Sequence, residues 1–94
     1  SKAKVAFKMA LEREVNDGFA LYNSGIIHFL EGNYDVASDL LANAGISYAE
    51  KSDTRSVALV ISALDKLEAL DYSLSKEVKK TNKLLKKFIN RERM

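Results

Sequence analysis

Few side chains in this sequence have the types and spacing that chemistry requires. There is one histidine, His28, and there is no cysteine, which excludes disulfides, thiolate metal sites and cysteine nucleophiles. No arginine precedes His28 with four to six residues between them, and no Glu-x2-His pair is present for a di-iron bundle. Phosphate-binding glycine loops and a nucleophile elbow are also missing from the sequence. The sequence therefore predicts a protein that is not an enzyme, with no catalytic residues, no metal site and no cofactor.

The strongest chemical signal is a cluster of lysines near the C-terminus. The net charge of +2 is a sum of two unlike parts. Residues 1–75 carry 7 Lys/Arg against 11 Asp/Glu (net −4), and residues 76–94 carry 8 against 2 (net +6). The candidate anion-binding residues are Lys76, Lys79, Lys80, Lys83, Lys86 and Lys87. These lysines could bind phosphate backbones or a membrane surface. Alternatively, they form a solvated face whose charge is balanced by the acids Asp35, Asp39, Glu50 and Asp53.

A second candidate site is a run of large apolar side chains in residues 19–30. The candidate partner-binding residues are Phe19, Tyr22, Ile26, Phe29 and Leu30. Their spacing is helical, and a large apolar face suits an amphipathic partner helix lying in a groove. The same stripe also fits an ordinary core that another helix covers. Both interpretations stay open.

Helices must position both candidate sites. The 94 residues are 47% hydrophobic and 30% charged, with no proline and four glycines, which favours a single all-α domain. Apolar spacing predicts five short helices in antiparallel hairpins, over about 2–15, 19–30, 34–51, 54–67 and 74–88. Asp53 is expected to cap the fourth helix, and Ser73 or Ser75 the fifth. The Asn16-Asp17-Gly18 run predicts a turn with a left-handed Gly18.

The N-terminal half contains a repeat at an offset of 34 residues. Ala3, Phe7 and Ala10 align with Ala37, Leu41 and Ala44, and the run Gly32-Asn33-Tyr34 precedes Ala37. Over residues 1–51 this pattern resembles a tetratricopeptide-repeat helical hairpin; MIT domains and small archaeal helical families have a similar hairpin. The resemblance implies either a repeat-like arrangement or a closed bundle, with residues 52–94 as a degenerate closing hairpin. It also implies that Leu21, Gly25 and His28 face the neighbouring helix.

The expected function is a helical protein–protein interaction module. It would bind a protein segment or self-associate through the apolar face of residues 19–30, and no small-molecule substrate is expected. The alternative is a nucleic-acid-binding accessory protein that uses the basic last helix. No targeting signal and no transmembrane segment are visible, which predicts a cytoplasmic location. The position of the last helix decides between the two interpretations of residues 19–30. If it packs over them, the apolar stripe is core; if it packs away from them, the stripe is an open surface.

Overall fold

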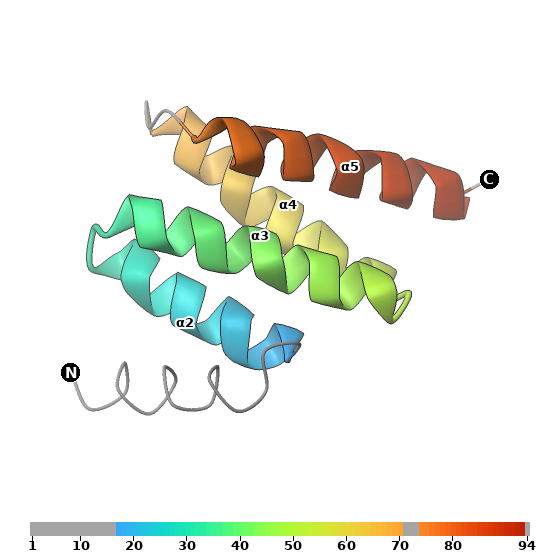
Figure 1. Cartoon of the computed structure of the whole chain (residues 1–94), viewed down its shortest axis with the longest axis horizontal. Helices are drawn as coiled ribbons and strands as arrows, with labels where there is room; N and C mark the ends of the chain where they lie inside the picture. Colours follow the sequence, from blue (N-terminus) through green and yellow to red (C-terminus); the bar gives the residue numbers. More distant parts are fainter. Residues whose placement is uncertain (1–16, 71–73, 94) are drawn as a thin grey trace.

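A computed structural model describes residues 17–70 and 74–93, and these residues form four helices. The helices are α2 (Gly18–Leu30), α3 (Tyr34–Glu50), α4 (Thr54–Ala69) and α5 (Lys76–Arg93) (Figure 1). No strand occurs in this part of the chain, so the predicted all-α class is confirmed. The helix expected over 2–15, the first copy of the repeat and the candidate cap Ser73 lie outside the described residues.

Asp17 begins α2 by capping its N-terminus. One carboxylate oxygen accepts hydrogen bonds from the backbone N–H groups of Phe19 (3.0 Å) and Ala20 (3.2 Å). These groups have no acceptor within the helix, so the cap satisfies them. Gly18 is the first residue of α2, and Gly32 is the one described glycine with a positive φ. The predicted left-handed Gly18 is therefore wrong. A Cβ at Gly18 would come within 2.9 Å of the Tyr48 ring, so close packing explains this glycine.

The two short turns that join α2, α3 and α4 have the same backbone hydrogen bonds. In the first, the N–H groups of Gly32 and Asn33 donate to Phe29 and His28; in the second, those of Ser52 and Asp53 donate to Ala49 and Tyr48. This pattern is a Schellman motif, which requires a left-handed residue after the helix. Gly32 (φ 82°) fills that position in the first turn, and Ser52 (φ 56°) fills it in the second.

Replacing Ser52 with glycine is expected to raise the free energy of unfolding by about 0.5–1 kcal/mol. The left-handed conformation places a Cβ against the backbone, and glycine removes that contact. Equilibrium urea unfolding of the variant and the wild type measures the difference. Gly32→Ser is the matched control, because it places the same strain in the equivalent turn, and it should destabilise the protein. An unchanged stability for both variants would contradict this explanation.

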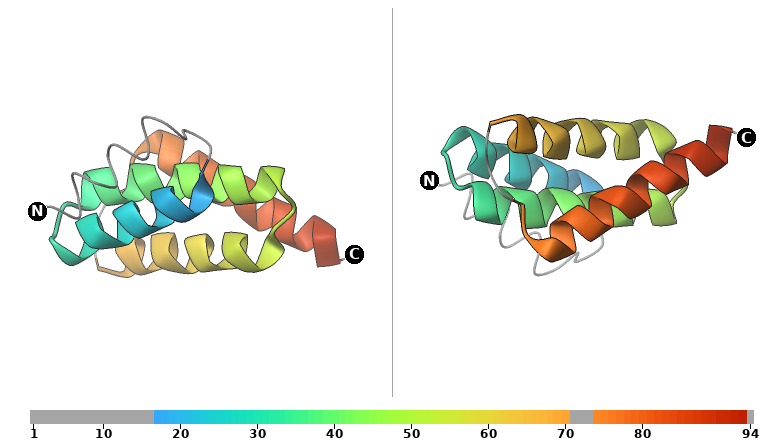
Figure 2. Two further views of the ribbon diagram at one scale, coloured as in Figure 1. Left: turned by 90° about the horizontal axis from the view of Figure 1, so that it is seen from below. Right: turned by 90° about the horizontal axis from the view of Figure 1, so that it is seen from above.

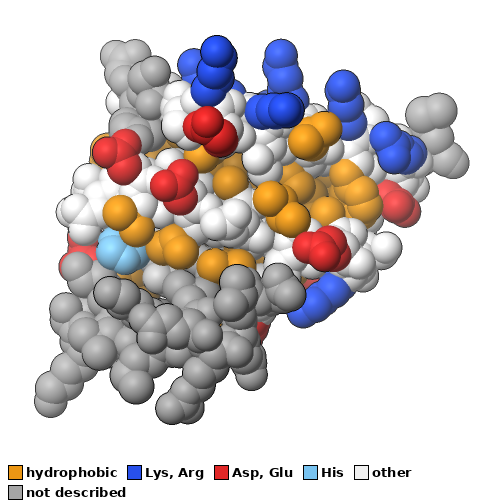
Figure 3. Space-filling model, in the orientation of Figure 1, with side chains coloured by type: hydrophobic (Ala, Val, Ile, Leu, Met, Phe, Trp, Pro, Cys, Tyr) orange, Lys and Arg blue, Asp and Glu red, His pale blue; other side chains and the backbone are white. Residues whose placement is uncertain are grey.

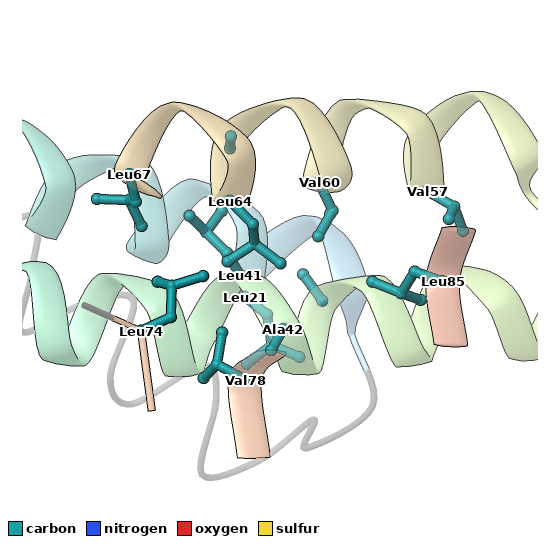
Figure 4. Packing of buried hydrophobic residues seen from close by; sticks show 12 residues of the cluster. Leu21, Leu41, Ala42, Val57, Val60, Leu64, Leu67, Leu74, Val78 and Leu85 are labelled. Atoms are coloured by element: carbon teal, nitrogen blue, oxygen red, sulfur yellow. The ribbon is translucent and has the colours of Figure 1, made fainter. Parts of the chain in front are cut away.

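Helix α3 lies at the centre of the fold and packs against the other three described helices (Figure 1). Helices α2 and α4 lie on the same side of α3 (Figure 2). The buried cluster draws side chains from every described helix, with Leu21 from α2, Leu41 from α3, and Leu64 from α4 (Figure 4). The α5 segment contributes Val78 and Leu85. The expected apolar stripes of α3, α4 and α5 thus meet in one core.

Two helix contacts depend on the absence of a side chain. A Cβ at Gly25 would lie 2.9 Å from Leu41 Cγ, where α2 crosses α3. A Cβ at Gly45 would lie 2.5 Å from Leu85 Cδ1 and 3.0 Å from Val60 Cγ1. Real Cβ atoms do not approach carbon this closely. Gly45 is therefore the point at which α3 meets both α4 and α5.

Ser75 caps α5, as one of the two expected alternatives, with its hydroxyl accepting from the Val78 N–H at 3.2 Å. The helix then packs on α3 and α4 rather than along α2. A polar contact accompanies this packing: buried Asn82 donates through Nδ2 to Asp65 of α4 at 3.1 Å, and its Oδ1 has no hydrogen-bond partner. Since α5 lies away from α2, it does not close over the candidate site in residues 19–30.

Candidate interaction surfaces

The structure divides the five predicted partner-binding residues into two groups. Phe19 and Leu30 are 67% and 77% exposed. Tyr22, Ile26 and Phe29 are half-buried and pack against the core cluster. Phe29 also lies against Tyr34 of α3, with ring centroids 5.7 Å apart. The stripe is thus partly core, as one of the two interpretations had it, and partly open surface.

The exposed Phe19 and Leu30 lie on a single line along α2 together with the half-buried Ile26. At 100° per residue, Phe19, Ile26 and Leu30 point within about 40° of one another. Leu21 and Gly25 are buried on the side that packs against α3, as expected for both. No Lys, Arg, Asp or Glu occurs between Gly18 and Leu30. An uncharged helix with two exposed, large apolar side chains is unusual for a surface that meets only water.

Helix α4 and the C-cap residue that ends it add two exposed leucines that the sequence did not single out. Leu59 is 53% exposed and Leu70 is 55% exposed. Both lie about 120–140° around α4 from Asp65, the residue that contacts α5. They therefore occupy the edge of α4 away from α5, and α4 lies on the same side of α3 as α2 does (Figure 2). The two leucines lie outside the core stripe of α4, and their spacing of eleven residues, about three helical turns, places them on one face. That spacing is the sequence signal that could have identified them.

We name these residues together the α2–α4 surface: Phe19, Ile26 and Leu30 from α2, with Leu59 and Leu70 from α4. The α4 part has a positively charged border. Arg55 lies one turn before Leu59, and Lys66 lies one turn before Leu70; both cations are exposed. The surface therefore combines apolar contact area with cations at one edge.

All six predicted anion-binding lysines are exposed on α5. In the space-filling view, Lys and Arg side chains follow the edge formed by α5, and acidic side chains lie over α3 (Figure 3). Lys86 forms an ion pair with Asp65 at 3.1 Å, and it is the one α5 lysine with an ion pair to a described residue. This acid is not among the four expected to balance the lysines, and Asp53 instead bonds to Ser56 as the cap of α4.

His28 lies half-buried near the end of α2. Its Nδ1 is 3.5 Å from the side-chain nitrogen of Asn33, the N-cap residue of α3, whose side chain makes no capping hydrogen bond. Within residues 17–70 and 74–93 no group of three His, Cys, Asp or Glu side chains is arranged to hold a metal ion. None of the helices in these segments is long and apolar enough to cross a membrane.

Tyr48 of α3 lies beside Gly18 at the start of α2, and its pKa is shifted. Burial raises its pKa, and the negative charges of Asp53 and Asp17 add to the effect. Because the pKa is higher in the folded state, Tyr48 stabilises the protein at pH values below 10.0, the pKa of this group in the unfolded chain. That stabilisation is lost as pH rises from the unfolded pKa through the folded one.

The free energy of unfolding is therefore expected to fall above pH 10, in part through Tyr48. Urea unfolding at pH 8 and pH 11 measures the fall. Because lysines also titrate in this range, the informative comparison is with Tyr48→Phe, which keeps the ring against Gly18 and cannot ionise. The variant should lose less stability between the two pH values than the wild type. An equal loss in both proteins would show that Tyr48 contributes nothing.

We compared the chain with models of known families, with curated proteins and with solved structures, and none of these comparisons found a match. Function is therefore inferred from the exposed residues themselves.

Proposed function

We propose that this protein is a non-enzymatic helical interaction module. It binds an amphipathic helix through the α2–α4 surface, supplied by another protein or by a second copy of the chain. One observation supports this most: α5 packs on α3 and α4, while Phe19 and Leu30 on α2 stay 67% and 77% exposed. Burying large apolar side chains against a partner stabilises the complex by roughly 25 cal/mol per Å² of apolar area removed from water.

The chemistry of the surface favours a partner helix with an acidic edge. The α2 part carries no formal charge, so it selects an apolar stripe. Arg55 and Lys66 border the α4 leucines and attract carboxylates on the neighbouring edge of a bound helix. Complementary charges at a rim speed association and fix the orientation of the partner.

The resemblance to tetratricopeptide repeats also supports this proposal. That family binds peptides along the inner surface formed by the first helix of each repeat, which corresponds here to residues 19–30. The close approach of Gly25 to Leu41 accords with the small-residue positions of the pattern. We therefore propose that residues 1–51 are a tetratricopeptide-repeat-like hairpin.

Two binding measurements on the wild-type chain test the proposal. The first is fluorescence anisotropy with a labelled 18-residue helical peptide that has leucines on one face and glutamates beside them. The second is sedimentation velocity between about 10 and 500 μM protein, which detects a second copy as the partner. We expect saturable peptide binding or a concentration-dependent dimer. A monomer at all concentrations that also fails to bind the peptide would contradict the proposal.

A further inference from the structure

The lysines of α5 form a ridge whose charge the rest of the fold does not neutralise. At 100° per residue, the six lysines from Lys76 to Lys87 fall within an arc of about 120°. That arc is opposite to Val78 and Leu85, which are buried. Lys86 is paired with Asp65, and the other five lysines have no ion pair with a described residue. We call these six lysines the α5 ridge.

The shape of the ridge distinguishes among anionic partners. The lysines extend along one helix for about 17 Å, so the charge is linear rather than planar. The neighbouring exposed face of α3 carries Asp35, Asp39 and Glu50. These acids would be repelled by an anionic membrane laid flat against both helices. In addition, Val78 and Leu85 on the apolar side of α5 are buried and cannot insert into lipid. A linear polyanion fits this arrangement better than a flat one.

We propose that the α5 ridge is a sequence-independent binding site for duplex DNA. The C-terminal end of α5, which follows the ridge lysines, projects beyond α3 and α4 (Figure 2). This projecting end is a helix about 10–12 Å in diameter, which fits the major groove of B-form DNA, about 12 Å wide, and does not fit the narrow major groove of duplex RNA. The ridge lysines before it then face the phosphates beside the groove. Lysines supply point charges to phosphates and no bidentate pairing to bases.

This site is separate from the α2–α4 surface, so the two proposals can fail independently. The test is fluorescence anisotropy with two 20-base-pair DNA duplexes of unrelated sequence, between 50 and 200 mM salt. We expect similar affinities for both sequences and a logarithmic affinity that falls linearly with logarithmic salt, with a slope of about −4 to −5 if five phosphates are contacted.

Matched triple variants locate the site. Lys80→Gln, Lys83→Gln and Lys87→Gln together should weaken binding at least about 10-fold and reduce the salt slope by about 2–3. The control combines Lys51→Gln, Arg55→Gln and Lys66→Gln, which remove the same charge from exposed positions outside α5. It should keep near wild-type affinity and slope. Circular dichroism of both variants checks that the helices remain.

Four results would overturn the proposal. These are no DNA binding at 50 mM salt, equal losses in the two triple variants, equal binding of a 20-base-pair RNA duplex, and tighter binding to vesicles containing 30% phosphatidylserine than to DNA. Equal losses would mean that net charge alone attracts the DNA. The other results would indicate either no partner of this kind or a different one.

Discussion

Replacing Gly45 with valine is expected to lower the free energy of unfolding by about 3 kcal/mol. A Cβ at this position already falls 2.5 Å from Leu85 Cδ1 and 3.0 Å from Val60 Cγ1, before the two methyl groups of valine are added. Val60 and Leu85 are themselves buried at 0% and 3% exposure, so neither has open space into which it can move. The helices must separate, and all three helices that meet at Gly45 lose contacts.

Equilibrium urea unfolding, monitored by circular dichroism, measures this loss. The matched control is Asn43→Val, which places the same residue at an exposed position of the same helix and should change stability by less than about 1 kcal/mol. Combining Gly45→Val with Leu85→Ala should recover part of the loss, because the smaller side chain relieves the contact. If Gly45→Val is as stable as Asn43→Val, then α5 does not approach α3 at this point.

Replacing both Phe19 and Leu30 with serine is expected to weaken binding at the α2–α4 surface about 10- to 100-fold. Truncating a central apolar contact commonly costs about 2 kcal/mol or more, and each 1.4 kcal/mol corresponds to a factor of ten. Since the two side chains are 67% and 77% exposed, the unfolding free energy should change by less than about 1 kcal/mol. The readouts are peptide anisotropy, the dimerisation constant and urea unfolding.

One further double change and one single change accompany this experiment. Leu59→Ser with Leu70→Ser should weaken binding in the same way, because α4 forms the other part of the surface. Leu84→Ser removes a leucine of α5 that is 56% exposed but lies outside the surface, and it should leave affinity unchanged. Unfolding of the Phe19/Leu30 variant would mean that the stripe belongs to the core. Unchanged affinity in a folded variant would mean that the partner binds elsewhere.

Local signals in the sequence predict much of the fold. Asp53 and Ser75 cap their helices as expected, because the side-chain oxygen of an Asp or Ser before a helix accepts hydrogen bonds from its free N–H groups. The stripes around Leu64 and Leu85 are buried because helical spacing alone brings their members to one face. The end of the second helix just before Gly32 is confirmed, since a glycine directly after a helix readily takes the left-handed conformation.

Features that depend on contacts between helices could not be predicted. Gly18 resembles a turn residue, but it is the first residue of α2 and packs against the Tyr48 ring. Asn82 looks like a surface residue of a basic helix, and its burial against Asp65 appears once α5 is placed on α4. Likewise, the exposure of Leu59 and Leu70 can be known only once the contacts of α4 with the other helices are known. The position of α5 decides whether α2 is covered, and neither spacing nor composition determines that position.

The most direct test of the proposed function is a ¹H–¹⁵N NMR titration of the wild-type protein with the acidic amphipathic peptide. We predict that the amide shifts concentrate in Gly18–Leu30 and on the Leu59 and Leu70 edge of α4, and that α5 is little affected. Shifts confined to α5, or no shifts at millimolar peptide in a protein that is monomeric, would contradict the assignment of the α2–α4 surface as the binding site.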